Sequence, residues 1–203
     1  MILVGRYLSP FVRRVGVSLK LLGVPYDLKE VSAVNDREAV EKHNPLGRVP
    51  ALVLDDGEVL IDSAAILDHL DQLVGAERAL VPAAGGERRR VLKLVALAQG
   101  VMEKALSYVV ETKLRPEPLR HQPFVDRFGN QAVAGLAELE RLAGAGWLHG
   151  SRISQADVST VVALDFLRLV GPQLAPEGRF PKLEALRDRA YALPAFTDTK
   201  PQF

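Results

Sequence analysis

The sequence predicts a small α/β domain followed by an all-α domain. In the first third of the chain, short apolar runs alternate with segments of helical periodicity. The segment Pro82–Gly86 contains only proline, alanine and glycine, which is typical of a linker, and beyond it the periodicity is helical alone. We therefore place the α/β domain at residues 1–76, the linker at 77–86 and the helical domain at 87–203.

The first domain is expected to have the element order β-α-β-α-β-β-α. Apolar residues recur every three or four positions after Pro10, which predicts a helix that Gly23 ends. Asp56-Gly57 stands between two apolar runs and predicts a hairpin. The expected elements are strands at 2–6, 25–31, 51–54 and 58–61, and helices at 10–22, 36–42 and 63–74.

The second domain is expected to contain helices only. The helix predicted over 154–169 is apolar almost all round, so we expect it to be buried. The other helices are expected at 88–113, 125–142 and 182–191.

Composition excludes several classes of function. The formal net charge of +1 provides no general attraction to nucleic acid or to an anionic membrane. The absence of cysteine excludes disulfides, thiolate metal sites and a cysteine nucleophile, and the four histidines lack metal-ligand spacing. No apolar run approaches the ~20 residues of a membrane helix, and Met1–Arg6 lacks the basic leader of a signal peptide. We expect a soluble cytoplasmic protein without a metal, a nucleic-acid partner or a membrane partner.

Ser9 is the first candidate for chemistry. Proline favours the first helical position, so Pro10 places Ser9 at the N-cap of the first helix. Its hydroxyl can simply cap that helix. The same geometry offers a hydroxyl and free N–H groups to an anion such as a thiolate, because the helix dipole is positive there.

The second candidate is the segment Asn44–Leu52. Pro50 stands at the start of an apolar strand, and its peptide bond is either trans, as in most X–Pro bonds, or cis. A cis bond would turn the Val49 backbone outward, where its N–H and C=O could pair with an extended peptide. Arg48 either meets a carboxylate or is simply solvated.

The third candidate is Asp62-Ser63, just before a predicted helix. Ser63 can be another N-cap beside an exposed Asp62. Alternatively, Ser63 and the helix start would bind an α-carboxylate, while Asp62 would pair with the adjacent α-ammonium group. The three segments together match the groups of one ligand: a thiolate, a peptide backbone and a γ-glutamyl head.

These segments resemble the glutathione transferase superfamily. Ser9–Arg13, Asn44–Pro50 and Asp62-Ser63 match its motifs in order and spacing, and the opening resembles serine-type members. Ile153–Asp157 resembles the hydrophobic staple and capping box before the family's buried helix. The resemblance implies a thioredoxin-like domain joined to a helical bundle. It also implies a cytoplasmic detoxification enzyme, usually a homodimer, with glutathione as co-substrate.

The resemblance also implies roles for individual residues. Ser9 falls on the thiolate-activating hydroxyl, Pro50 on the family's cis-proline and Val49 on the backbone that pairs with the cysteinyl unit. Asp62 and Ser63 fall on its acidic-serine pair, with aspartate where glutamate is more common. The remaining glutathione-binding positions are Phe11, Asn35 and Arg48, of which Arg48 and Asn35 are alternatives for the glycine carboxylate.

A second substrate, a small electrophile, is expected to lie beside the long helix that starts near Arg88. For each candidate residue of that helix, the spacing alone favours a plain core or dimer contact over a substrate contact. The candidates are Gln99, Met102, Glu103, Leu106 and Tyr108. The alternatives to a conjugating transferase are a glutathione-dependent disulfide or peroxide reductase and a non-catalytic binding module, because fold alone does not fix function.

Overall fold

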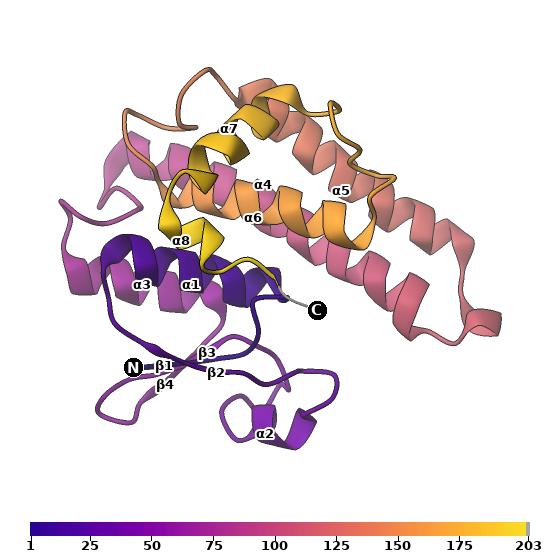
Figure 1. Ribbon diagram of the computed structural model, residues 1–203, viewed down its shortest axis with the longest axis horizontal. Helices are drawn as coiled ribbons and strands as arrows, with labels where there is room; N and C mark the ends of the chain where they lie inside the picture. Colours follow the sequence, from indigo (N-terminus) through magenta and orange to yellow (C-terminus); the bar gives the residue numbers. More distant parts are fainter. Residues whose placement is uncertain (202–203) are drawn as a thin grey trace. The chain divides into compact units, whose positions relative to one another are not determined.

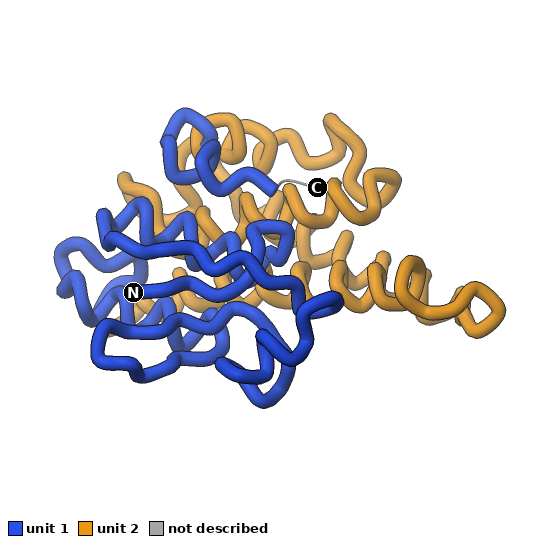
Figure 2. The backbone as a smooth tube through the Cα atoms, turned by 60° about the horizontal axis from the view of Figure 1, so that its bottom comes forward, with its two compact units in different colours: residues 1–83, 191–203 blue, residues 84–190 orange. Residues whose placement is uncertain are grey.

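The computed structural model describes residues 1–201, which form two compact units (Figure 2). The first unit contains residues 1–83 together with the segment from Tyr191 onward, and the second contains residues 84–190. The element order confirms the predicted fold class, a thioredoxin-like α/β unit with a helical unit. Residues 202 and 203, which the sequence assigns to the helical domain, lie outside the described residues.

The α/β unit has a four-stranded sheet in the order β2-β1-β3-β4, with α1 and α3 on the same side of it (Figure 1). Strand β2 runs parallel to β1, whereas β3 and β4 are antiparallel to their neighbours. The elements are β1 Ile2–Val4, α1 Pro10–Leu22, β2 Asp27–Lys29, α2 Arg37–Glu41, β3 Ala51–Val53, β4 Val59–Ile61 and α3 Ser63–Val74.

Alternation along the central strands divides the core between the two faces of the sheet. Leu3 and Leu52 pack into the cluster that contains the buried residues of α1 and α3. Their neighbours Val4 and Ala51 belong to a smaller cluster with Val40 of α2. Successive side chains of a strand point to opposite faces, so each central strand contributes to both clusters.

The segment after Tyr191 also belongs to the first unit. It contains a short helix, α8, over Pro194–Thr197, which packs on α1. Sequence periodicity did not predict α8, because four residues make little more than one turn. Arg13 of α1 is buried and donates a hydrogen bond to the carbonyl oxygen of Thr199.

The helical unit is built around α4, which packs against α5 and α6. Gly135 allows α4 and α5 to approach closely, because a Cβ there would lie 2.5 Å from Cγ2 of Val101. Helix α6 is buried along most of its length, as its apolar composition predicted. The helices are α4 Gly85–Val109, α5 Gln122–Leu142, α6 Gln155–Val170 and α7 Pro181–Tyr191, with a π-helical turn at Val110–Leu114 and a 3-10 turn at Glu117–Leu119.

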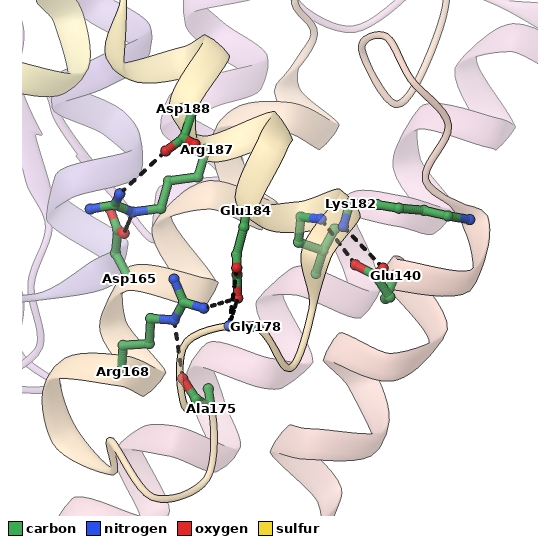
Figure 3. A network of polar contacts seen from close by, with 10 residues as sticks. Glu140, Asp165, Arg168, Ala175, Gly178, Lys182, Glu184, Arg187 and Asp188 are labelled. Carbon is green, nitrogen blue, oxygen red and sulfur yellow. Dashed lines mark hydrogen bonds and ion pairs between the residues drawn. The ribbon is translucent and has the colours of Figure 1, made fainter.

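Polar contacts fix the start of α7 within this unit (Figure 3). The carboxylate of Glu140, on α5, accepts hydrogen bonds from the backbone N–H groups of Lys182 and Leu183 at 3.0 and 2.9 Å. An anion at the start of a helix satisfies free N–H groups and favours the helix dipole. Arg187 further along α7 donates to Asp165 of α6. Within residues 1–201, the helices lack the combined length and apolarity needed to span a membrane.

Candidate functional site

The register of the sheet brings one end of each of the four strands to the same edge of the α/β unit. Ala51 pairs with Val4 on one side and with Ile61 on the other, and Val4 also pairs with Lys29. The loops that follow β1, β2 and β4 and the loop that precedes β3 therefore start from the same edge. The candidate segments around Ser9, Asn35, Val49 and Asp62 lie in or next to these loops.

Gly5 permits two of these loops to meet. Its φ is +134°, and a Cβ at this position would lie 2.5 Å from Cγ2 of Val12 and 3.1 Å from Cβ of Val49. A larger residue would collide with Val12 and would also force Val49 to move slightly. Glycine therefore lets the loop that contains Val49 pack against the first turn of α1, next to Ser9.

The Val49–Pro50 peptide bond is cis, which confirms the expectation from the motif. The loop before it is built on Asn44, a buried residue. The Asn44 Nδ2 donates to the carbonyl of Arg48 at 2.9 Å, and its Oδ1 accepts the N–H of Leu46 at 3.0 Å. Within residues 1–201, the N–H and C=O of Val49 have no hydrogen-bond partner. A free donor and acceptor on one residue can pair with the backbone of a peptide.

Ser9 is the N-cap of α1, and Pro10 is the first helical residue. The Ser9 Oγ accepts the N–H of Val12 at 3.5 Å, near the limit at which a hydrogen bond is counted. The side chain is half-buried. A long capping bond leaves the hydroxyl available to a ligand at the positive end of the helix dipole.

Tyr7 is a second hydroxyl in the same loop. Its Oη shares a hydrogen bond of 2.6 Å with the Oη of Tyr26, the residue just before β2. Burial, followed by this bond, raises the pKa of Tyr26 far above its usual value. The Tyr7 hydroxyl is therefore committed to packing between α1 and β2, whereas the hydroxyl of Ser9 is free to meet a ligand.

Asp62 is the only non-glycine residue with positive φ among residues 1–201, at φ 66°. Its Oδ1 accepts the N–H of Ala64 at 2.9 Å and so caps α3. The carboxylate is exposed, and its Oδ2 has no hydrogen-bond partner within the described chain. Aspartate is short enough to cap the helix with one oxygen and keep the other for a cation.

Ser63 follows Asp62 as the first residue of α3 and is only 1% exposed. Its Oγ accepts a hydrogen bond of 3.1 Å from the Nε of Arg14, a residue of α1 that is completely buried. Arg14 is not among the residues that the sequence motifs indicated as candidates. Its burial marks it as a functional candidate, because arginine is rarely buried without a specific role.

Arg48 and Asn35, the alternatives for a terminal carboxylate, are both exposed. The N–H of Asn35 donates to the Oγ of Ser32 at 3.2 Å. Nearby, the Nζ of Lys29 lies 3.1 Å from Nε2 of His43. Burial, followed by the charges of Lys29 and Lys42, lowers the pKa of His43.

Comparison with known proteins identifies the family. The description "Glutathione S-transferase, N-terminal domain" matches residues 3–78, and "Glutathione S-transferase, C-terminal domain" matches residues 122–189. The GST-like protein YibF of Escherichia coli K12 is 30% identical over 98% of both chains. The chain belongs to the glutathione S-transferase family. Its relatives include the maleylacetoacetate isomerase of Pseudomonas aeruginosa, which is 31% identical over 96% of this chain and 93% of that protein.

A solved structure supports the same assignment for this glutathione S-transferase family member. It is a family member from Pseudomonas fluorescens Pf-5 with bound glutathione, at 33% identity and a TM-score of 0.88. The match covers 100% of this chain and 99% of that one.

The residues of α4 that the sequence suggested for a second substrate differ in exposure. Met102 is completely buried, because α4 packs against two helices of its unit at this point. Leu106 is 38% exposed, and Glu103 is exposed and accepts a long 3.4 Å hydrogen bond from Gln99. The hydroxyl of Tyr108 accepts a hydrogen bond from Gln173. In the part of the chain that the structure describes, no cluster of three or more possible metal ligands occurs.

Proposed function

We propose that the protein binds glutathione at the sheet edge and activates its thiol for attack on a small electrophile. One observation carries the proposal: the register places Ser9, Val49 and the Asp62-Ser63 pair around the same edge of one sheet. The Ser9 hydroxyl at a helix start matches the thiol of this ligand, and the unpaired backbone groups of Val49 match its peptide. The Asp62 carboxylate beside a second helix start matches the γ-glutamyl head.

The thiol would lie at the start of α1. A thiolate there accepts the Ser9 hydroxyl hydrogen and faces the positive end of the helix dipole. Both interactions favour the charged form and so lower the thiol pKa. The long 3.5 Å cap of Ser9 supports this role, because little capping energy is lost when the hydroxyl turns to sulfur.

The rest of the ligand follows along the sheet edge. The cysteinyl backbone would pair with the free N–H and C=O of Val49. The α-ammonium group would meet Oδ2 of Asp62, and the α-carboxylate would lie at the start of α3 near Ser63. Arg48 and Asn35 are candidates for the glycine carboxylate, and Phe11, 7% exposed, supports the first turn of α1 from below.

The reaction we favour is conjugation. The thiolate sulfur forms a bond to an electrophilic carbon. Either a leaving group departs from that carbon with its bonding electrons, or a π bond or C–O bond to that carbon opens and the atom that receives its electrons takes up a proton. The chain contains no cysteine, so the nucleophile is supplied by the ligand. The exposed Leu106 and Glu103 of α4 are our candidates for contact with this second substrate.

A second candidate reaction is glutathione-dependent isomerisation. The 31% identity to a maleylacetoacetate isomerase over nearly the whole chain favours it. In such a reaction the thiolate adds to a conjugated double bond, the carbon–carbon bond rotates and the thiolate leaves unchanged. It requires the same activated thiol as conjugation, so Ser9 would serve both reactions.

Calorimetry followed by turnover assays tests these proposals. Glutathione should bind at one site per chain, and S-methylglutathione should compete for it. The purified protein is then assayed with an aryl halide, maleylacetoacetate, a glutathione mixed disulfide and an organic peroxide. No binding at millimolar glutathione would refute the function. Binding without turnover of any of the four would favour the non-catalytic module.

We further propose a cytoplasmic homodimer. The apolar residues of α4 that suggested a free face, such as Leu94 and Val95, are buried within the chain. A groove of about 450 Å³ between α4 and α5 remains open, however, and is flanked by Lys93 and Lys104. A second copy would cover it with the exposed apolar residues of the α/β unit, such as Leu73. Light scattering at micromolar concentration should give twice the chain mass, and Leu97→Glu in the groove should give the monomer mass.

A further inference from the structure

Arg14 and Ser63 form a buried polar contact between two helices of the α/β unit. Arg14 is completely buried in α1, and Ser63 is the first residue of α3. The Nε–H of Arg14 donates to Oγ of Ser63 at 3.1 Å. This bond joins residues 49 positions apart in sequence and ends at the proposed carboxylate-binding position.

The bond determines how the Ser63 hydroxyl can be used. A serine hydroxyl has one hydrogen to donate and two lone pairs that accept. Since Arg14 donates to the oxygen, the hydroxyl hydrogen has to turn away from the guanidinium. Within residues 1–201 the Ser63 hydroxyl donates to no acceptor, although the residue is only 1% exposed. A buried hydroxyl hydrogen without an acceptor costs stability, and a carboxylate would satisfy it.

We infer that Arg14 is a positioning residue that presents the Ser63 hydroxyl as a hydrogen-bond donor to the α-carboxylate of the γ-glutamyl group. This inference rests on the proposed binding of glutathione. In this arrangement Arg14 does not contact the ligand. It donates to the Ser63 oxygen, so the Ser63 hydroxyl hydrogen is left to donate to the α-carboxylate of the ligand. Its buried positive charge also raises the potential at the start of α3, where the helix dipole acts in the same direction.

Arg13 provides a matched control on the same helix. It is an adjacent arginine, 1% exposed, but it donates to the hydroxyl of Tyr191 and to the carbonyl of Thr199 instead of to Ser63. Loss of either guanidinium should destabilise the unit. Only loss of the Arg14 guanidinium should reduce the affinity that the α-carboxylate of glutathione contributes.

The experiment compares two ligands by calorimetry. Glutathione is compared with 4-aminobutanoyl-cysteinylglycine, which lacks only the α-carboxylate and keeps the amine that Asp62 would bind. The wild-type protein should bind glutathione at least about 10-fold more tightly than this analogue, as expected for a hydrogen bond to a charged group. Arg14→Met and Arg14→Gln should each reduce that ratio about fivefold or more, with affinity for the analogue changed less than about twofold.

Two further variants separate positioning from folding. Arg13→Gln should retain the wild-type ratio although it is destabilised. Ser63→Ala should reduce the preference for glutathione over the analogue. Adding Arg14→Met to Ser63→Ala should reduce that preference little further, because the two residues act as one unit. A folded Arg14 variant with the wild-type ratio would overturn the inference and leave the proposed function intact. Failure of the wild-type protein to bind glutathione would instead refute the proposed function.

A measurement on the unmodified protein covers the case in which neither Arg14 variant folds. The Nε–H resonance of Arg14, followed by ¹⁵N NMR, should shift when glutathione is added and stay in place when the analogue is added. Equal shifts with both ligands, or no shift with glutathione, would contradict the positioning role.

Discussion

The Nε of Arg13 donates a hydrogen bond of 3.0 Å to the carbonyl oxygen of Thr199, so the last part of the described chain is fixed to the first helix. The same guanidinium donates to the hydroxyl of Tyr191 at 2.9 Å and lies 5.8 Å from the centre of its ring. These contacts explain why the segment after Tyr191 belongs to the α/β unit. They also give an arginine of the first motif a role in folding.

Arg13→Gln should lower the free energy of unfolding by about 2–4 kcal/mol, because it leaves several buried carbonyl and hydroxyl groups without their donor. Urea denaturation followed by circular dichroism measures this loss. Lys20→Ala is the control, since Lys20 pairs with Asp198 of the same segment in an exposed ion pair. That pair should be worth less than about 1 kcal/mol. Equal losses for the two variants would show that burial of Arg13 has no special role.

Glu111 gives a pH-dependent prediction for the helical unit. Its carboxylate accepts the N–H of His121 at 2.8 Å and Nε of Arg115 at 2.8 Å. The bond from His121, then that from Arg115, lowers the pKa of Glu111 from its usual value near 4.5. A lowered folded-state pKa means that the carboxylate stabilises the protein above pH 4.5, and that this stability is lost as pH falls through the folded-state pKa.

The difference in unfolding free energy between wild type and Glu111→Gln should therefore be constant from about pH 7 to 6 and shrink below about pH 4.5. Denaturation in guanidinium chloride at a series of pH values measures it. Glu117→Gln, an exposed neighbour in the same connection, should show a much smaller difference throughout. A difference for Glu111→Gln that does not change with pH would mean that its hydrogen bonds do not depend on the charge.

The α/β core and the local geometry of the candidate segments could be predicted from the sequence because their signals are local. The helix start at Ser9, the loop ending in Pro50 and the acidic-serine pair each depend on neighbouring residues. Arg14 escaped detection because its role requires α1 to pack on α3, 49 residues away. The burial of Met102 on α4 could not be predicted from sequence for the same reason. Its exposure depends on which helices cover that face of α4 and not on the spacing of apolar residues.

Asp62→Asn separates the helix cap from the charge at the same position. Asparagine keeps an Oδ1 for the N–H of Ala64 and tolerates the positive φ of 66°. Glutathione affinity should fall by about 1–3 kcal/mol, since a charge-assisted hydrogen bond becomes a neutral one. Stability should change little, because the cap survives.

Asp62→Ala is the companion variant, because it removes the charge and the cap together. It should lose a similar amount of glutathione affinity and, in addition, about 1 kcal/mol or more of unfolding free energy. Calorimetry and urea denaturation give the two quantities separately. Full affinity in Asp62→Asn would place the α-ammonium group elsewhere.

Ser9→Ala decides whether the first hydroxyl of the chain activates the thiol or only caps α1. The cap is long at 3.5 Å, so its loss should cost about 1 kcal/mol or less of stability. A hydroxyl that donates to the thiolate should have a larger effect on chemistry, because removing it raises the pKa of bound glutathione. Turnover at neutral pH should then fall about 10- to 100-fold and recover in part at higher pH, as the thiol ionises without help.

The measurement is thiolate absorbance of the glutathione complex against pH, with wild type and Ser9→Ala compared at saturating ligand. Tyr7→Phe is the control, because the Tyr7 hydroxyl is bonded to Tyr26 and should leave the titration midpoint in place. The loss in Ser9→Ala should be incomplete, since the N–H groups at the start of α1 still face the sulfur. Coincident titration curves for wild type and Ser9→Ala would make Ser9 a structural cap and assign the activation to the helix start alone.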